Sequence, residues 1–158
     1  MYTIISIVGR SGAGKTTLIE KLIPELRGRG LKIGTIKHNL HGFEIDIPGK
    51  DSSRHKQAGS TTTIISSPHQ IGMIMDVDHD HELDELAPLL ADMDIILTEG
   101  YKRDSKPKIE VLGPDVDKEP ILKDDDNLIA VVSDEEVDLS VPRFKTGDIK
   151  GLADFLLK

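Results

Sequence analysis

The chain has 158 residues, enough for one domain with a real core, and its 37% hydrophobic and 30% charged residues indicate a folded globular protein. The absence of cysteine excludes a disulfide framework, a thiolate nucleophile and a Cys-type zinc site. The net charge of −8 argues against non-specific nucleic-acid binding, which needs a basic surface, so we expect no nucleic-acid partner.

The first segment, Thr3 to Val8, is apolar and β-branched, as expected for a strand buried on both faces of a parallel sheet. It lacks the basic start of a signal peptide, and no apolar run reaches the roughly 20 residues of a membrane-spanning helix. We therefore expect a cytoplasmic protein without a membrane segment. Glycines follow from Gly9 to Gly14, and apolar residues at helical spacing then predict a helix from Lys15 that ends near Gly28.

The remaining chain alternates between strand and helix patterns. The predicted strands are 32–37, 61–66, 70–75, 94–98, 108–112, 128–132 and 141–144. The predicted helices are 51–58, 82–90 and one after Asp148, and Asp51 and Asp148 are expected to cap the first and the last of these. The strands 61–66 and 70–75 are expected to form a hairpin, which would extend the sheet as antiparallel edge strands and offer a dimerisation surface. The order predicts an α/β fold of the P-loop NTPase type: three α/β/α layers, a mostly parallel sheet and a single domain over residues 1–158.

A complete phosphate-binding motif, G-x-x-x-x-G-K-[ST], lies between the first strand and the first helix. Its glycines let backbone N–H groups surround phosphate oxygens, and the helix N-terminus adds partial positive charge. Lys15 would place a cation on the β- and γ-phosphates, and Thr16 would offer its hydroxyl to Mg²⁺. The predicted nucleotide-binding residues here are Gly9, Arg10, Ser11, Gly12, Ala13, Gly14, Lys15, Thr16 and Thr17.

Glu99 ends the buried strand 94–98, at the edge where open α/β sheets bind ligands. A carboxylate there can hold Mg²⁺ or orient water, so Glu99 is predicted to act with Lys15 in catalysis and with Thr16 in metal binding. Asp46, in the polar loop after the second strand, is the competing metal ligand, although a loop aspartate also commonly shapes a turn. Lys50 and Arg54 are candidate phosphate contacts or solvated cations, and His38 is expected to line the nucleotide site.

Asp134 follows the strand 128–132, where a P-loop GTPase uses an aspartate to accept hydrogen bonds from guanine N1–H and the exocyclic amine. The usual N-K-x-D is replaced by Val131-Val132-Ser133-Asp134, so only the aspartate matches. A capping role is the alternative. The histidines of His79-Asp80-His81 lack a complete zinc spacing, and solvated loop histidines are the favoured reading there.

A run of residues after the second predicted strand forms a specific pattern: Lys37-His38-Asn39-Leu40-His41-Gly42-Phe43, Asp46, Pro48-Gly49-Lys50-Asp51-Ser52, Arg54-His55 and Ala58-Gly59. Together with the P-loop, Thr98-Glu99-Gly100-Tyr101-Lys102 and Ser133-Asp134, this pattern resembles the molybdopterin-guanine dinucleotide biosynthesis protein B (MobB) family. It implies a GTP-binding homodimer with weak GTPase activity, which works as an adapter in molybdenum cofactor biosynthesis. It also implies GTP and Mg²⁺ as ligands, and as partner the guanylyltransferase that attaches GMP to molybdopterin.

Two other functions stay open at this stage. A small-molecule kinase could use the same loop, but its lid would have to be residues 102–127, which contain Arg103 alone among arginines. A scaffold with a purely structural nucleotide is the other possibility. If the chain is an enzyme at all, the residues favour slow GTP hydrolysis, since no glutamine is placed to orient water.

Overall fold

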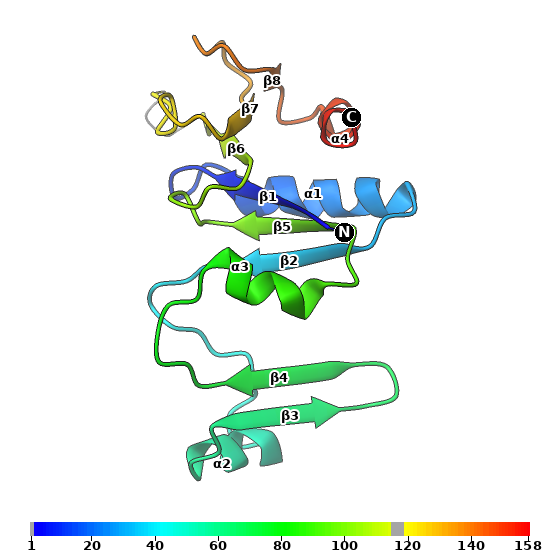
Figure 1. Cartoon of the computed structure of the whole chain (residues 1–158), viewed down its shortest axis with the longest axis vertical. Coiled ribbons are helices and arrows are strands. Elements are labelled where there is room, and N and C mark those ends of the chain that lie inside the picture. Colours follow the sequence, from blue (N-terminus) through cyan, green and yellow to red (C-terminus); the bar gives the residue numbers. More distant parts are fainter. Residues whose placement is uncertain (1, 115–118) are drawn as a thin grey trace. The chain divides into compact units, whose positions relative to one another are not determined.

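The computed structural model describes residues 2–114 and 119–158. These residues fall into two compact units, one made of the residues up to His38 together with those from Glu82 onward, the other of Asn39–His81 (Figure 1). The prediction of a single domain over residues 1–158 stays a prediction.

The first unit is built on a six-stranded sheet in which every neighbouring pair of strands is parallel. Its strand order is β2-β5-β1-β6-β7-β8. The strands are β1 (Thr3–Val8), β2 (Ile33–Lys37), β5 (Ile95–Glu99), β6 (Lys108–Val111), β7 (Leu128–Val132) and β8 (Arg143–Phe144). This arrangement confirms the predicted α/β fold class. Because parallel strands end at one edge, the residues after β1, β5 and β7 meet there.

Helices cover both faces of this sheet, which gives the three layers. The helices are α1 (Lys15–Gly28), α3 (Leu83–Leu86), the 3₁₀-helix η1 (Ala87–Leu90) and α4 (Ile149–Leu156). Alternate residues of β1 point to opposite faces. Ile5 and Ile7 pack in the cluster that contains the apolar stripes of α1 and α4, whereas Ile4 packs with Leu83 of α3.

Local sequence explains where the helices begin and end. α1 stops at Gly28, and Gly30 follows in the left-handed region with φ +88°. The predicted helix 82–90 is in fact two short helices, because Pro88 cannot donate an α-helical hydrogen bond and the chain tightens into η1. Asp148 caps α4 as predicted: its carboxylate accepts a hydrogen bond of 3.0 Å from Gly151 N–H.

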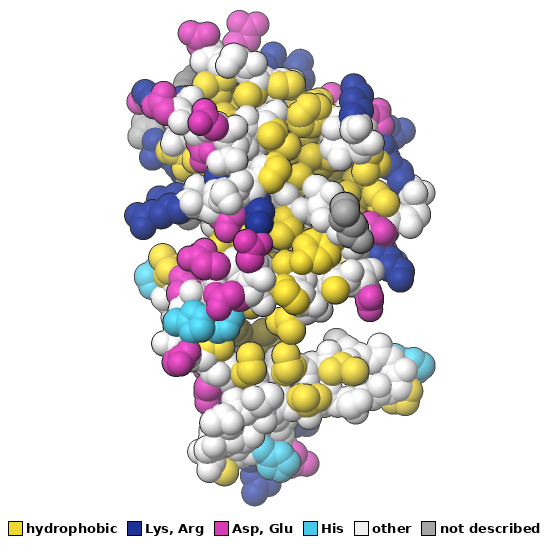
Figure 2. Space-filling view, viewed as in Figure 1, with side chains coloured by type: hydrophobic (Ala, Val, Ile, Leu, Met, Phe, Trp, Pro, Cys, Tyr) yellow, Lys and Arg dark blue, Asp and Glu magenta, His cyan; other side chains and the backbone are white. Residues whose placement is uncertain are grey.

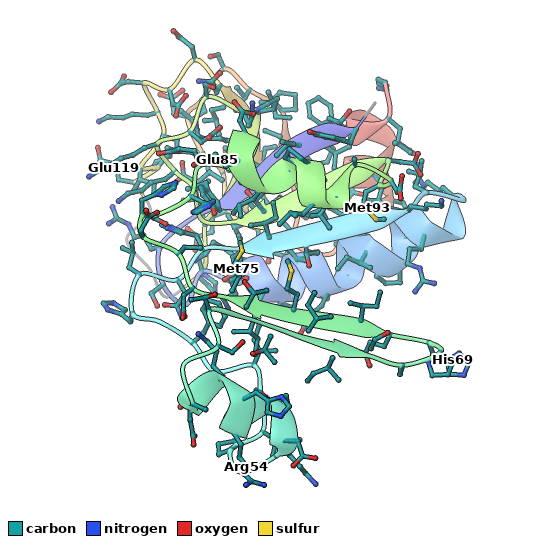
Figure 3. The ribbon with its side chains drawn as sticks, turned by 60° about the horizontal axis from the view of Figure 1, so that its bottom comes forward. Arg54, His69, Met75, Glu85, Met93 and Glu119 are labelled. Atoms are coloured by element: carbon teal, nitrogen blue, oxygen red, sulfur yellow. The ribbon has the colours of Figure 1, made fainter. Side chains whose placement is uncertain are left out.

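The second unit consists of α2 (Asp51–Gln57) and a hairpin of β3 (Thr62–Ser66) and β4 (Ile71–Met75). The hairpin is confirmed, but it forms a two-stranded sheet of its own and adds no strands to the six-stranded sheet. Figure 3 shows His69 at its turn and Arg54 on α2. Asp51, expected to cap α2, is the first helical residue, and Lys50 takes the cap position without a side-chain bond.

None of the helices in the described ranges has both the length and the apolar character needed to cross a bilayer.

Candidate nucleotide-binding site

The P-loop joins the end of β1 to the start of α1. Gly12 and Gly14 adopt left-handed φ values of +78° and +96°, which a side chain would strain. Gly9 packs so tightly that a Cβ would lie 2.4 Å from the carbonyl oxygen of Val111 in β6. The loop is therefore shaped for phosphate oxygens and seated on the central strands.

The ammonium group of Lys15 lies across this loop. Its Nζ donates to the carbonyl oxygens of Gly9, at 3.0 Å, and Arg10, at 2.8 Å. Backbone carbonyl groups of the P-loop thus hold the Lys15 ammonium group, which is predicted to contact phosphates, at the loop. Thr17, the remaining predicted residue of the segment, lies exposed in the first turn of α1.

The two predicted magnesium ligands of the first unit meet directly. Thr16 Oγ1 donates a hydrogen bond of 3.0 Å to Oε2 of Glu99, 83 positions away in the chain. Lys37 Nζ lies 3.7 Å from the other carboxylate oxygen of Glu99. A hydroxyl and a carboxylate are oxygen donors of the kind that Mg²⁺ prefers, so these residues fit that ion.

A tight turn follows Glu99 and brings His38 to the site. Gly100 has φ +107° and Tyr101, which is not a glycine, has φ +54°, a conformation that persists only where the surroundings hold it. His38 N–H donates to the Glu99 carbonyl at 3.0 Å, and its ring centroid lies 4.7 Å from that of Tyr101. The structure thus places His38 next to Glu99 and Tyr101, and the predicted contact of His38 with the nucleotide stays a prediction.

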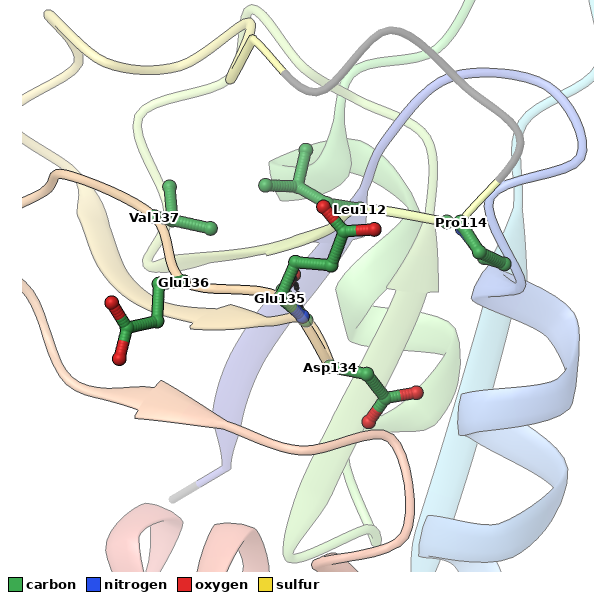
Figure 4. Close-up of a pocket in the computed structure, with 8 residues that line it drawn as sticks. Leu112, Pro114, Asp134, Glu135, Glu136 and Val137 are labelled. Atoms are coloured by element: carbon green, nitrogen blue, oxygen red, sulfur yellow. Dashed lines mark hydrogen bonds between the residues drawn. The ribbon is translucent and has the colours of Figure 1, made fainter.

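A small pocket opens at the ends of β6 and β7, lined by residues 112–114 and 133–137 (Figure 4). It adjoins the P-loop, because a Cβ on Gly113 would lie 2.9 Å from the Ala13 Cα. Asp134 lines it, and both of its carboxylate oxygens accept hydrogen bonds from Thr146: one from the backbone N–H, at 3.0 Å, and one from the hydroxyl, at 2.7 Å.

These bonds favour the ionised carboxylate. The Thr146 hydroxyl and then its amide hold the pKa of Asp134 below the usual aspartate range. Sequence reasoning missed Thr146, which lies twelve positions beyond Asp134 in an irregular segment. Asp134 follows β7 and Thr146 follows β8, and the two residues meet because these strands pair in parallel.

Asp46 and Lys50 belong to the second unit. Oδ1 of Asp46 accepts from Ile47 N–H, at 2.8 Å, and from Ser52 Oγ, at 3.0 Å, while its buried Oδ2 has no hydrogen-bond partner in the described part of the chain. Asp46 therefore shapes its own loop, and the predicted Mg²⁺ contact of Asp46 and nucleotide contact of Lys50 stay predictions.

A match to a protein family model shows the family of this chain. A family model described as "Molybdopterin guanine dinucleotide synthesis protein B" (MobB) matches residues 4–134, which include the P-loop, Glu99 and Asp134. The chain belongs to the MobB family.

Relatives and solved structures agree with this membership. The molybdopterin-guanine dinucleotide biosynthesis adapter protein of Escherichia coli (strain K12) is 37% identical, over 100% of this chain and 93% of its own length. The protein of that name from Haemophilus influenzae is 34% identical over 97% and 86%. A crystal structure of molybdopterin-guanine biosynthesis protein B is 32% identical, covers 98% of this chain and 96% of its own, and has a TM-score of 0.79.

Proposed function

We propose that this MobB family member is a GTP-binding adapter in the synthesis of molybdopterin guanine dinucleotide, and that it hydrolyses GTP slowly. The pathway role follows from the family, whose relatives in E. coli and H. influenzae carry the name adapter protein. The observation that carries the nucleotide part is the bond from Thr16 to Glu99, which joins the P-loop to a carboxylate at the strand edge.

In the proposed complex, the loop amides and Lys15 hold the β- and γ-phosphates. Thr16 and Glu99 hold Mg²⁺, which would supply positive charge to the phosphates. Asp134 accepts hydrogen bonds from guanine N1–H and the 2-amino group, since each carboxylate oxygen keeps a lone pair beyond the one used by Thr146. Adenine lacks this pair of donors, so the same carboxylate favours GTP over ATP.

Slow hydrolysis follows from what surrounds the phosphates. Attack by water needs a group that orients it, and neither the P-loop segment 9–16 nor the segment 98–102 contains a glutamine. Lys15 and the loop amides stabilise charge but orient no water. We therefore propose that nucleotide binding, rather than turnover, is what the adapter uses. The partner is the guanylyltransferase that attaches GMP to molybdopterin.

We also propose a homodimer formed through the hairpin. One face of it is apolar and exposed: Ile64 pairs with Met73 across the strands, Ile71 and Met75 lie on the same face, and these four side chains are 45–73% exposed. In Figure 2 hydrophobic side chains lie open on the hairpin. A two-stranded sheet with such a face gains stability by packing against another surface.

Calorimetric titration with GTP and with ATP, each with Mg²⁺, tests the nucleotide assignment. Wild-type protein should bind GTP more tightly than ATP, and Lys15→Ala should lose most of that affinity. Equal or tighter binding of ATP would overturn the guanine assignment and, if an added acceptor became phosphorylated, would favour the small-molecule kinase instead.

A further inference from the structure

A second hollow lies beside the P-loop, and its charged lining is entirely basic. It has a volume of about 470 Å³, which is in the range of small-molecule sites. The lining consists of Gly9, Arg10, Ser11, Lys102, Arg103, Ile121 and Leu122. Gly9, Arg10 and Ser11 belong to the P-loop, so the hollow adjoins the nucleotide site. Lys15, Thr16, Glu99 and Asp134 do not line it, so it extends beyond the residues proposed to hold Mg²⁺ and the base. Three cations gather here in a chain whose net charge is −8.

The first wall is a turn with Lys102 and Arg103 at its tip. Asp104 N–H donates to the Tyr101 carbonyl at 3.0 Å and closes the turn, which leaves both cations exposed. Across residues 2–114 and 119–158, neither these two cations nor Arg10 forms an ion pair. Lys102 and Arg103 therefore present positive charge to solvent, whereas Arg10 is attracted electrostatically to the carboxylates of Glu110 and Glu119.

A buried lysine braces this turn from below. Lys108 in β6 is 1% exposed, its ammonium donates to the carbonyl oxygen of Asp104, and it forms an ion pair of 2.9 Å with Asp125. The Asp104 carboxylate in turn accepts from Lys106 N–H at 2.8 Å. The position of Lys102 and Arg103 is thus fixed from inside the fold.

A buried glutamate braces the opposite wall. Glu110 is two residues beyond Lys108, hence on the same face of β6, and it is fully buried. Its carboxylate accepts hydrogen bonds from Ile121 N–H, at 2.7 Å, and Leu122 N–H, at 3.0 Å. Burial raises the pKa of Glu110, so placing this carboxyl inside the protein has a cost.

The two buried charges explain why the hollow is preformed. A buried ion is a poor source of stability, and an apolar pair on β6 would serve the core as well. Lys108 and Glu110 instead each hold a loop against β6, the strand that pairs with β1. The basic turn, the P-loop and the apolar pair Ile121–Leu122 therefore surround one space. A rigid basic wall facing an apolar wall suits an organic phosphate, because guanidinium and ammonium groups bind its oxygens.

We infer that this hollow binds the phosphate group of a second, organic phosphate monoester alongside the P-loop nucleotide. The inference rests on the proposed function in one respect, namely that the P-loop holds the nucleotide. Arg10 and Ser11 belong to both the P-loop and the hollow, so the second ligand lies directly against the nucleotide site. Lys102 and Arg103 provide its main charge recognition.

The test uses phenyl phosphate as the probe, titrated into full-length protein loaded with Mg²⁺ and a non-hydrolysable GTP analogue, and followed by NMR. Saturable binding is expected. Lys102→Ala with Arg103→Ala should weaken it at least about tenfold, the loss expected for removing charge-assisted hydrogen bonds. The control is Lys21→Ala with Arg27→Ala, which removes equal charge from the exposed face of α1 and should change binding less than about twofold.

Three results would overturn the inference: absence of saturable binding, equal losses in both double variants, or displacement of the probe by the nucleotide analogue. The last would assign the hollow to the nucleotide's own phosphates. The titration is repeated on nucleotide-free Lys15→Ala protein. If the wild-type protein fails to bind GTP but phenyl phosphate still binds to both proteins and needs Lys102 and Arg103, the proposed nucleotide function falls while the anion site stands.

Discussion

At the scale of single residues, the bond between Thr16 and Glu99 makes a prediction about the proposed Mg²⁺ site. Thr16→Val keeps the side-chain shape but removes the hydroxyl, so the affinity gained on adding Mg²⁺ should fall by about tenfold. GTP affinity measured in EDTA should stay unchanged. Titrations of both proteins with and without Mg²⁺ check this, and an unaltered Mg²⁺ gain in the variant would remove Thr16 from the metal site.

Asp134 is predicted to recognise the guanine base by hydrogen bonds, and Thr146 is predicted to position the Asp134 carboxylate. Asp134→Asn exchanges an acceptor for a donor, which suits the C2 carbonyl of xanthine, so GTP affinity should fall and XTP affinity rise, each by about tenfold. Thr146→Val should reduce the preference for GTP over XTP, and Thr146→Ser should restore it. Competition binding gives these ratios, with Thr62→Val on the hairpin as control. A ratio that no substitution changes would refute the guanine contact.

The raised pKa of Glu110 makes a pH prediction. The folded state holds this proton more tightly than the unfolded chain, so the contribution of Glu110 to stability improves as the pH falls from 7 through its folded pKa, and levels off below the unfolded value. Glu110→Gln does not titrate. The unfolding free energy of wild-type protein relative to the variant should therefore rise on acidification, as urea titrations at several pH values would show. A difference that falls or stays constant would contradict the burial account.

The candidate site residues that could be predicted from the sequence belong to local motifs. Gly9 to Thr16 and Glu99 follow buried strands directly, and parallel strands bring their ends together, so the Thr16–Glu99 meeting was predictable. Lys108 and Glu110 were not. Charges on a predicted strand normally indicate solvent, and their burial depends on loops that close over β6, with contacts that no periodicity encodes.

At the scale of elements, the hairpin's exposed apolar face makes a prediction about assembly. Ile64→Asp together with Met73→Asp places two charges opposite each other on that face, so a dimer that packs this face should dissociate. The matched control, Thr61→Asp with Ser67→Asp, adds the same charge just outside the two strands. Sedimentation velocity should show monomers only for the first variant. A dimer that survives both substitutions would move the interface elsewhere.

Element prediction failed at Pro88 and in the sheet to which the hairpin strands belong. The helices after Lys15 and Asp148 and the buried strands were predictable, because their apolar spacing and caps agree with burial. Pro88 divides the segment 82–90 into α3 and η1. That the hairpin would form a separate sheet was beyond the sequence, since strand alternation gives no information about which sheet a strand joins.

At the scale of the whole molecule, the six parallel strands organise the site. Gly9, Glu99 and Asp134 come from three different strand ends, yet the order β5-β1-β6-β7 places those ends along one edge. The sheet thus brings together, from segments distant in sequence, the residues for which we propose phosphate, metal and base contacts. Family membership over residues 4–134 covers this arrangement and identifies the pathway in which we propose that it works.

The most direct test of the central claim is the yield of molybdopterin guanine dinucleotide from the partner guanylyltransferase, measured with and without this protein. A GTP-binding adapter should increase the yield, and Lys15→Ala, with its P-loop disabled, should not. If the wild-type protein leaves the yield unchanged, or if Lys15→Ala stimulates equally well, the proposal of a nucleotide-dependent adapter is contradicted.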